Sequence, residues 1–532
     1  MTQTNSNSNF DINTDIVVIG SGIGGLSCAA LSAKYGFNVV VCESHSIAGG
    51  AAHGFERNGY KFDSGPSLYS GLSYSPSPNP LQQVLAAIGE ELPCVNYDTW
   101  GCCLPEGDFD TQVGAEQFCE VLQQLRGESA VDEWKQLQRV MMPFAQSAIA
   151  LPTASLRLDL GAFRTVGKFA PLMLRHGANI GKLTGPFSQI MDDVVSDSFI
   201  RNWLNLLCFL LSGLPADSTN AAEVAFMFAD WYKPNVKLDY PIGGSAALVE
   251  ALVRGLKKHN AELMLNAHVE QIIVENKRAV GVRLRNGKVI RASKAVISNA
   301  SVWDTLKLIP QGSISPKYRA ERQATPECDS FMHLHLGIDA QGIRKDLACH
   351  YIFVKDWKLG ITAPQNVVLI SIPSVLDPTL APSGKHVIHV YTPGNEPYAL
   401  WKGMDRGSKE YREQKEVRYH RRWLPRASQI MWSALERVIP DIRQRCEVTL
   451  TGTPLTHERY LRRHNGSYGP AIRASEGLFP GAKTPLAGLL CCGDSTFPGI
   501  GLPAVAGSGM ITANTLAPVE KHLAMLREIG VA

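Results

Sequence analysis

Three glycines and one acidic residue near the start of the chain have the types and spacing of a dinucleotide-binding site. Gly20, Gly22 and Gly25 follow the G-x-G-x-x-G pattern, and Glu43 comes about 20 residues later. The first glycine permits a tight turn, the second admits a pyrophosphate close to the backbone, and the third lets a helix pack closely on a strand. The carboxylate of Glu43 is placed to accept hydrogen bonds from an adenosine ribose.

The surrounding sequence predicts the strand, helix and strand that would hold these residues in place. Residues 16–19 form a β-branched run typical of a buried strand. Residues 26–35 are rich in Ala, Ser and Leu, as in a helix that stops near Gly36, and a second strand at 39–41 leads to Glu43. The positive end of the helix would carry the pyrophosphate. An isolated glycine motif is weak evidence, but here all five features follow in order.

A second nucleotide-contacting segment is expected close to the C-terminus. Residues 488–509 combine an apolar strand, the acid Asp494, a Gly/Pro loop and the start of a helix. The carboxylate would bond the hydroxyls of a phosphate–ribityl chain, and the helix start suits developing negative charge on a flavin. Two such segments far apart in one chain indicate FAD held extended between them. The sequence has no second G-x-G-x-x-G, so no NAD(P)H-binding domain is expected.

The expected cofactor-binding residues extend beyond the fingerprint. The fingerprint alone does not separate NAD from FAD, but a glycine pair shortly after the acid resembles the extension found in FAD enzymes of the two-dinucleotide-binding family. A strand near Val269 would meet the adenine with its backbone. The full expected set is Gly20, Ser21, Gly22, Ile23, Gly24, Gly25, Glu43, Gly49, Gly50, Ala51, Val269, Gly493, Asp494, Gly501, Leu502 and Pro503.

Composition and charge narrow the class of protein. The 532 residues are 45% hydrophobic and 19% charged, as in globular proteins, and the net charge of +3 indicates no nucleic-acid partner. Twelve cysteines without C-x-x-C spacing indicate reduced thiols in a cytosol-like compartment. Residues 1–14 lack signal- and transit-peptide patterns and predict a disordered tail. The expected location is cytoplasmic, in a bacterial or cyanobacterial cell, or a plastid if a targeting segment is missing from this sequence.

Residues 156–182 have the composition of a helix that lies in a membrane interface. Basic and apolar side chains occur there together with one opposing acid, Asp159, although a solvated helix in a lid has the same pattern. Two apolar runs, 203–214 and 221–232, are too short to span a bilayer. They predict an apolar tunnel or a membrane-bound surface, with a plain helical core as the alternative. A membrane surface, bound peripherally, is therefore an expected partner.

Several short motifs, spread over residues 15–515, resemble the carotenoid isomerase branch of the phytoene-desaturase-like flavoproteins. They lie at 19–26, 59–65, 240–244, 297–305, 349–357, 371–384 and 493–499. The stretches outside the nucleotide fingerprint make the resemblance specific. It implies an α/β fold with a Rossmann-type FAD-binding domain of the amine-oxidase and phytoene-desaturase kind, an antiparallel-sheet substrate domain and a helical lid.

The order of the motifs predicts how the chain is divided. After the tail, the FAD-binding domain would be assembled from residues 15–105, 240–300 and 485–532. The helical lid or membrane-binding region would be 106–239, and the substrate-binding domain 301–484.

The resemblance implies an apolar carotenoid or other polyene as substrate. The expected reaction is cis–trans isomerisation of a poly-cis carotenoid with reduced FAD and no net redox change. Two departures from the family pattern leave the reaction open: Ala48 stands where Pro is usual, and residues 500–503 read Ile-Gly-Leu-Pro beside the expected flavin. The alternatives are net desaturation or saturation of a polyene, and hydration, rearrangement or carriage of a xanthophyll.

Few residues stand out as acids or bases. Tyr69, together with Asp63 and Ser67, falls in a stretch that passes under the flavin in such proteins, and His350 can titrate near neutral pH. Tyr69 and His350 are the expected catalytic residues, although each could equally be a satisfied structural residue. No Ser-His-Asp set, metal-ligand cluster or carboxylate pair stands out, and no metal is expected.

Overall fold

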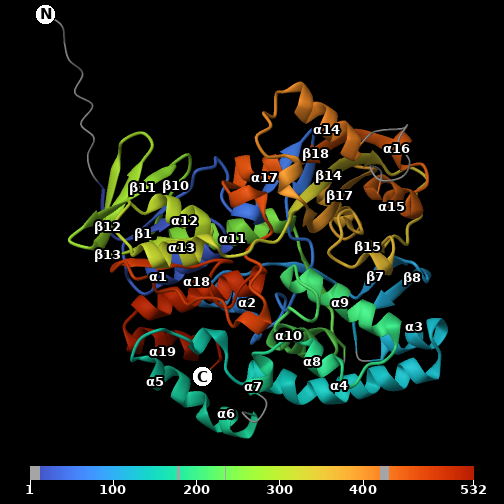
Figure 1. Cartoon of the computed structure of the whole chain (residues 1–532), viewed down its shortest axis with the longest axis horizontal. Helices are drawn as coiled ribbons and strands as arrows, with labels where there is room; N and C mark the ends of the chain where they lie inside the picture. Colours follow the sequence, from blue (N-terminus) through green and yellow to red (C-terminus); the bar gives the residue numbers. More distant parts are fainter. Residues whose placement is uncertain (1–11, 115, 177–179, 234, 420–429, 532) are drawn as a thin grey trace, which may run out of the picture.

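The computed structural model describes residues 12–114, 116–176, 180–233, 235–419 and 430–531. Two seven-stranded sheets and a group of helices make up the molecule. Figure 1 shows the first sheet on the left, the second at the upper right and the helical group below the second.

The first sheet is built around parallel, fully buried strands. Its order is β10-β2-β1-β13-β12-β11, and β19 pairs with β13. The pairs that join β10, β2, β1, β13 and β19 are parallel, whereas β12 and β11 extend the sheet as an antiparallel hairpin. The bounds are β1 (Ile12–Ile19), β2 (Val39–Cys42), β10 (Glu262–Met264), β11 (Val269–Glu275), β12 (Arg278–Leu284), β13 (Val289–Ser298) and β19 (Leu489–Cys491).

The start of β1 corrects the predicted tail. Residues 12–14 were expected to be disordered, but they pair with Ile290, Arg291 and Ala292 of β13, and this pairing extends the strand. Residues 1–11 of the predicted tail lie outside the described residues.

Helices cover the first sheet and bring distant segments together. The helix α1 (Ile23–Lys34) packs against α18 (Leu502–Leu516) and α11 (Gly244–Lys258), and α2 (Pro80–Ile88) packs against α18. The N-terminal glycine loop and the C-terminal segment are therefore neighbours. The remaining helices near this sheet are α12 (Val302–Leu308), α13 (Pro316–Gln323) and α19 (Val519–Glu528).

The second sheet is almost entirely antiparallel, and one of its faces packs against helices. Its order is β18-β14-β17-β16-β15-β7-β8, antiparallel except for the β15–β7 pair. Leu334 and Leu336 share an apolar core with Leu435 of α15 on one face. The bounds are β7 (Thr99–Leu104), β8 (Gly107–Gln112), β14 (Ser330–Asp339), β15 (His350–Val354), β16 (Val367–Ser371), β17 (Lys385–Glu396), β18 (Cys446–Gly452), α14 (Lys409–Tyr419), α15 (Ile430–Val438), α16 (Ile442–Arg445) and α17 (Pro454–Leu461).

Short strands join the two halves of the molecule, one built around the first sheet and the other around the second. The hairpin β3 (Gly54–Arg57) and β4 (Tyr60–Asp63) meets the second sheet, since a Cβ added at Gly337 would lie 2.7 Å from the ring of Tyr60. A three-stranded sheet comprises β5 (Tyr69–Ser70), β9 (Leu238–Pro241) and β6 (Cys94–Tyr97). The predicted boundary at residue 105 falls inside the β7–β8 hairpin, and both strands join the second sheet because β7 pairs with β15.

The two apolar runs that suggested a tunnel or a membrane surface form a helical core instead. They correspond to α9 (Ser198–Ser212) and α10 (Ala221–Trp231), which pack with α4 (Glu128–Ile149) and α3 (Gln117–Leu125). Trp134, Trp203 and Phe228 are buried at the centre of this group. Nearly every side of these helices has a neighbour, which is why their sequence is apolar almost all round.

The basic and apolar segment before this core forms several short helices rather than one long helix. They are α5 (Ala162–Val166), α6 (Ala170–His176) and α7 (Ile180–Leu183), followed by α8 (Ser188–Met191). Gly161 and Gly167 flank α5, where glycine weakens a continuous helix. Within the part of the chain that the structure describes, no helix combines the length and apolarity needed to cross a bilayer.

The helical core predicts that truncating a buried leucine destabilises the protein far more than truncating an exposed one. Leu204 is 0% exposed in α9, whereas Leu174 is 86% exposed in α6. We expect Leu204→Ala to lower the free energy of unfolding by about 2–5 kcal/mol, because it leaves a cavity. Leu174→Ala should change it by less than about 0.5 kcal/mol. Urea unfolding followed by circular dichroism measures both, and equal effects would contradict the assignment of α9 to the core.

Candidate functional site

The glycine loop between β1 and α1 is held by hydrogen bonds to Glu43. The backbone N–H and Oγ of Ser21 donate to Oε2 of Glu43 at 2.8 and 2.6 Å, and the N–H of His45 donates to Oε1 at 2.8 Å. Gly25 leaves no room for a side chain, since a Cβ there would lie 2.2 Å from the carbonyl oxygen of Gly20. Glu43 thus orients the loop, in addition to any contact with a ribose.

The second glycine pair packs directly on this loop. The N–H of Gly49 donates to the carbonyl of Ser21 at 3.0 Å, and a Cβ on Gly50 would lie 3.0 Å from the Cα of Gly22. Both glycines have positive φ angles, 115° and 56°. The structure therefore brings Ser21, Gly22, Gly49 and Gly50 together, and Ala51 follows them in the chain.

The C-terminal segment closes the other side of the loop. A Cβ on Gly24 would lie 3.0 Å from the Cα of Gly493, and Gly493 donates from its N–H to Oγ of Ser508 at 3.1 Å. Gly501 is the N-cap of α18, with Leu502 and Pro503 as its first residues. The N- and C-terminal sets predicted from the sequence are therefore in contact.

Two further residues at this junction were missed. A Cβ added at Gly22, Gly24 or Gly493 would lie 2.7–2.8 Å from the side-chain amide of Asn299, which follows β13. Arg463, just after α17, forms an ion pair with Asp494. The sequence does show a polar turn at the end of the 295–300 strand, which is a signal for Asn299. Arg463 has no comparable signal.

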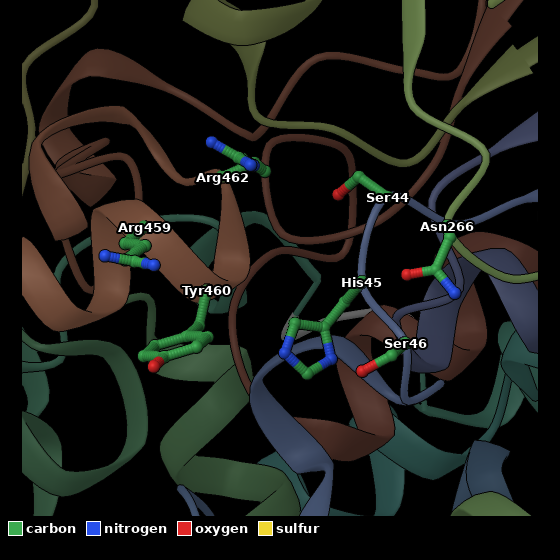
Figure 2. Close-up of a pocket in the computed structure, with 7 residues that line it drawn as sticks. All are labelled: Ser44, His45, Ser46, Asn266, Arg459, Tyr460 and Arg462. Carbon is green, nitrogen blue, oxygen red and sulfur yellow. The ribbon is translucent and has the colours of Figure 1, made fainter. Parts of the chain in front are cut away.

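The predicted adenosine end lies beside an open pocket. The N–H of Ala267, two residues before Val269, donates to the carbonyl of Glu43 at 2.7 Å. Figure 2 shows the pocket, of about 190 Å³, with the ring of Tyr460 facing His45. It is lined by Ser44, His45, Ser46, Asn266, Arg459, Tyr460 and Arg462.

Asp63 lies at the centre of the contact between the two halves of the molecule. Its carboxylate accepts from the N–H and Oγ of Ser245 at 2.8 and 2.6 Å, and from the hydroxyl of Tyr240 at 2.8 Å. Burial raises its pKa, an effect that these hydrogen bonds oppose. Ser67, also predicted to face a flavin, is 3.2 Å from the Tyr391 hydroxyl. Asp63 thus ties β4 to β9 and α11.

The two expected catalytic residues, Tyr69 and His350, are both buried deep in the protein. The ring of His350 is 5.4 Å from that of Tyr97, and burial lowers the pKa of His350 to about 3. The Tyr69 hydroxyl donates to the carbonyl of Pro66 at 3.0 Å, and burial raises its pKa well above the usual value. Both groups are therefore neutral at neutral pH. His350 is not available there as an imidazolium acid, and Tyr69 is not available as a phenolate base.

Three histidines that did not stand out as a metal-ligand cluster in the sequence lie together on the second sheet. His333 and His335 of β14 and His389 of β17 lie together, and all three are buried. Nδ1 of His333 is 2.6 Å from Nε2 of His389, and His335 donates to the carbonyl of Asp63 at 3.2 Å. The H-x-H spacing at 333–335 within a strand was the available signal, because it places two imidazoles on one face.

The sequence of the chain is similar to a family model and to known proteins. Residues 18–86 match the model of the "NAD(P)-binding Rossmann-like domain". The chain is 31% identical over 512 residues to "Prolycopene isomerase, chloroplastic" of Daucus carota, covering 94% of this chain and 80% of that protein. It is 24% identical over 526 residues to "All-trans-retinol 13,14-reductase" of Danio rerio, covering 90% of this chain and 82% of that protein.

A solved structure has the same fold. A putrescine oxidase double mutant from a redesign of cofactor binding superposes with a TM-score of 0.62 at 15% identity, covering 96% of this chain and 100% of that chain. At that identity the likeness concerns the fold alone, and it confirms the predicted α/β architecture with a Rossmann-type domain. The likeness to the Daucus carota protein shows more than the fold, because it combines 31% identity with 94% coverage of this chain. The chain therefore belongs to the prolycopene isomerase family, the carotenoid isomerase branch that its motifs resemble.

Proposed function

We propose that the protein binds FAD between its N- and C-terminal segments. The glycines of the loop, of the 49–51 turn and at 493 let these backbone segments pack against one another without a Cβ between them. This supports the proposal, because it brings the two predicted nucleotide-contacting segments together, as a site for an extended dinucleotide requires. Glu43 and Ala267 lie at the end suited to the adenosine, and α18 begins at the end suited to the flavin.

The reaction that we propose is cis–trans isomerisation of a poly-cis carotenoid, with reduced FAD and no net redox change. The likeness to a prolycopene isomerase over 94% of the chain carries this proposal. Reduced FAD would supply the electron density that weakens a polyene double bond in the transition state. Tyr69, Tyr97 and His350 would give an apolar polyene uncharged surroundings, since burial shifts the pKa of each away from ionisation near neutral pH.

Net redox chemistry on a polyene is the second candidate. The likeness to a retinol reductase over 90% of the chain favours it. The departure at 500–503 lies in the same region as the proposed flavin site, because Gly501 is the N-cap of α18. Hydration, rearrangement or carriage of a xanthophyll has no such support from the comparisons, and it enters as an outcome of the test.

We also propose that the α5–α6 surface docks on a membrane that supplies the apolar substrate. Leu160, Phe163 and Leu174 are 84%, 81% and 86% exposed, which is unusual for large apolar side chains so close together. Lys168 and Arg175 are exposed beside them and suit anionic lipid headgroups. Figure 1 shows α5 and α6 at the lower edge of the molecule, away from both sheets.

FAD binding predicts that Glu43→Ala weakens flavin retention by at least about tenfold, since a hydrogen bond to a charged group is worth about 1.5–3 kcal/mol. Denatured wild-type protein should release FAD in equimolar amount, measured by absorbance and chromatography. The matched control is Glu275→Ala, because Glu275 pairs with Arg291 at the exposed edge of the same sheet. A colourless protein that binds NAD instead would contradict the assignment.

Isomerisation predicts many turnovers for each reduction of the flavin. Photoreduced enzyme under anaerobic conditions should convert a poly-cis carotenoid catalytically, and chromatographic retention and absorption of the product report the conversion. Flavin-depleted Glu43→Ala protein serves as the control. Product formation that tracks consumption of an electron acceptor would indicate a desaturase, and product that tracks oxidation of a donor would indicate a saturase.

Membrane docking predicts that replacing two exposed apolar side chains weakens lipid binding. Phe163→Ser with Leu174→Ser should lower the affinity for anionic vesicles by about tenfold or more, because burying one large apolar side chain is worth about 1.5–3 kcal/mol. Leu359→Ser with Leu478→Ser is the control, since those leucines are 52% and 51% exposed elsewhere. Flotation at two salt concentrations measures binding, which added salt should weaken. Wild-type protein that never floats would refute docking.

A further inference from the structure

The histidine cluster of His333, His335 and His389 has no part in the proposed isomerisation. We propose that it binds a divalent transition-metal ion of the zinc type through three neutral imidazoles. One ligand nitrogen of each residue lies within 4.8 Å of those of the other two. Three histidines are a recurring ligand set for zinc in proteins.

The second sheet builds this arrangement through its register. Side chains two residues apart on a strand share a face, so His333 and His335 point to the same side of β14. His335 pairs directly with His389 on the antiparallel neighbour β17, and their rings stack at 4.4 Å with planes 6° apart. Two adjacent strands therefore deliver all three imidazoles to one place, without any long loop.

One histidine is already oriented as metal ligands usually are. Nε2 of His335 donates to the carbonyl of Asp63, which leaves the lone pair of Nδ1 for an ion. Histidine ligands almost always donate their second ring N–H to a carbonyl or carboxylate, and this fixes the ring and its tautomer. The acceptor is itself rigid, because Ser245 and Tyr240 hold the side chain of Asp63.

Coordination of one ion requires the imidazole rings to rotate, because the three ring planes lie within 9° of parallel and an ion lies in the plane of each imidazole that binds it. Nδ1 of His333 and Nε2 of His389 are 2.6 Å apart, so one of these nitrogens donates a hydrogen bond to the other. In a tetrahedral site with Zn–N distances of about 2.0–2.1 Å, two ligand nitrogens lie roughly 3.3 Å apart. An ion would replace the proton of this hydrogen bond and separate the two atoms by rotation of the side chains.

The donor set and its burial select the class of ion. Imidazole nitrogens suit zinc, copper, nickel and iron, whereas magnesium and calcium require oxygen ligands. The three residues are 3%, 7% and 2% exposed, so an ion would be shielded from solvent. His457 provides a further imidazole, with its ring 4.7 Å from that of His333, and its Nε2 has no hydrogen-bond partner among the described residues.

The test measures zinc in the flavin-loaded, full-length protein. Wild type, His389→Gln and His386→Gln are produced in zinc-supplemented cells, and bound zinc is measured by mass spectrometry after gel filtration. His386 is the matched control because it lies on β17 three residues from His389 and bonds Ser374 instead. X-ray absorption at the zinc edge of the wild type counts nitrogen and sulfur ligands, which separates imidazoles from the cysteines.

We expect equimolar zinc in wild type and His386→Gln, with three or four nitrogen ligands and no sulfur. His389→Gln should lose zinc affinity on the order of 100-fold, since even changes outside the ligand set cost about 10–100-fold. Wild type without zinc, zinc bound through sulfur, or full zinc in folded His389→Gln would each overturn the proposal. If His389→Gln does not fold, the ligand count of the wild type decides alone.

Discussion

The rest of the structure depends on how closely the backbone must approach itself at the glycine loop. A Cβ on Gly25 would lie 2.2 Å from the carbonyl of Gly20, and one on Gly24 would lie 3.0 Å from both Gly493 and the carbonyl of Val505. Only glycine permits β1, α1 and the C-terminal segment to meet there. This contact brings two segments more than 450 residues apart together at the proposed nucleotide site, and Glu43 holds the loop through Ser21.

A second contact joins this site to the other sheet. Asp63 accepts hydrogen bonds from α11 and β9 through its side chain, while its carbonyl accepts one from His335 on β14. A buried polar group with all of its partners in place fixes the relative position of the elements that it joins. Ser67, which was predicted to lie near a flavin, contacts the same sheet, with its Oγ 3.2 Å from the hydroxyl of Tyr391 on β17.

Local patterns explain which features the sequence predicted. The strand–glycine–helix order, the acid at 43 and the Gly-Asp turn near 493 are short motifs whose geometry is local, so their elements form where expected. The runs at 203–214 and 221–232 were ambiguous because a buried helix and a membrane-facing helix have the same composition. Their burial around Trp203 depends on packing against α4, and the sequence of the two runs alone does not show that α4 lies beside them.

Features that depend on strand pairing were harder to predict. Strands β7 and β8 join the second sheet because β7 pairs with β15, about 250 residues away. The histidine cluster likewise needs the register of β14 against β17, since His389 is far from His333 in sequence. The ion pair between Arg463 and Asp494 is also non-local. Each requires knowledge of which strands or loops are neighbours, and no single segment supplies it.

The central claim is that the protein rearranges a polyene without changing its composition. The most direct test is the mass of the product formed from a poly-cis carotenoid in D₂O, with flavin-loaded, prereduced enzyme and no oxygen. The account predicts a product of unchanged mass that differs from the substrate only in retention and absorption. A mass lower or higher by two hydrogens or deuteriums, or higher by one D₂O, would contradict it.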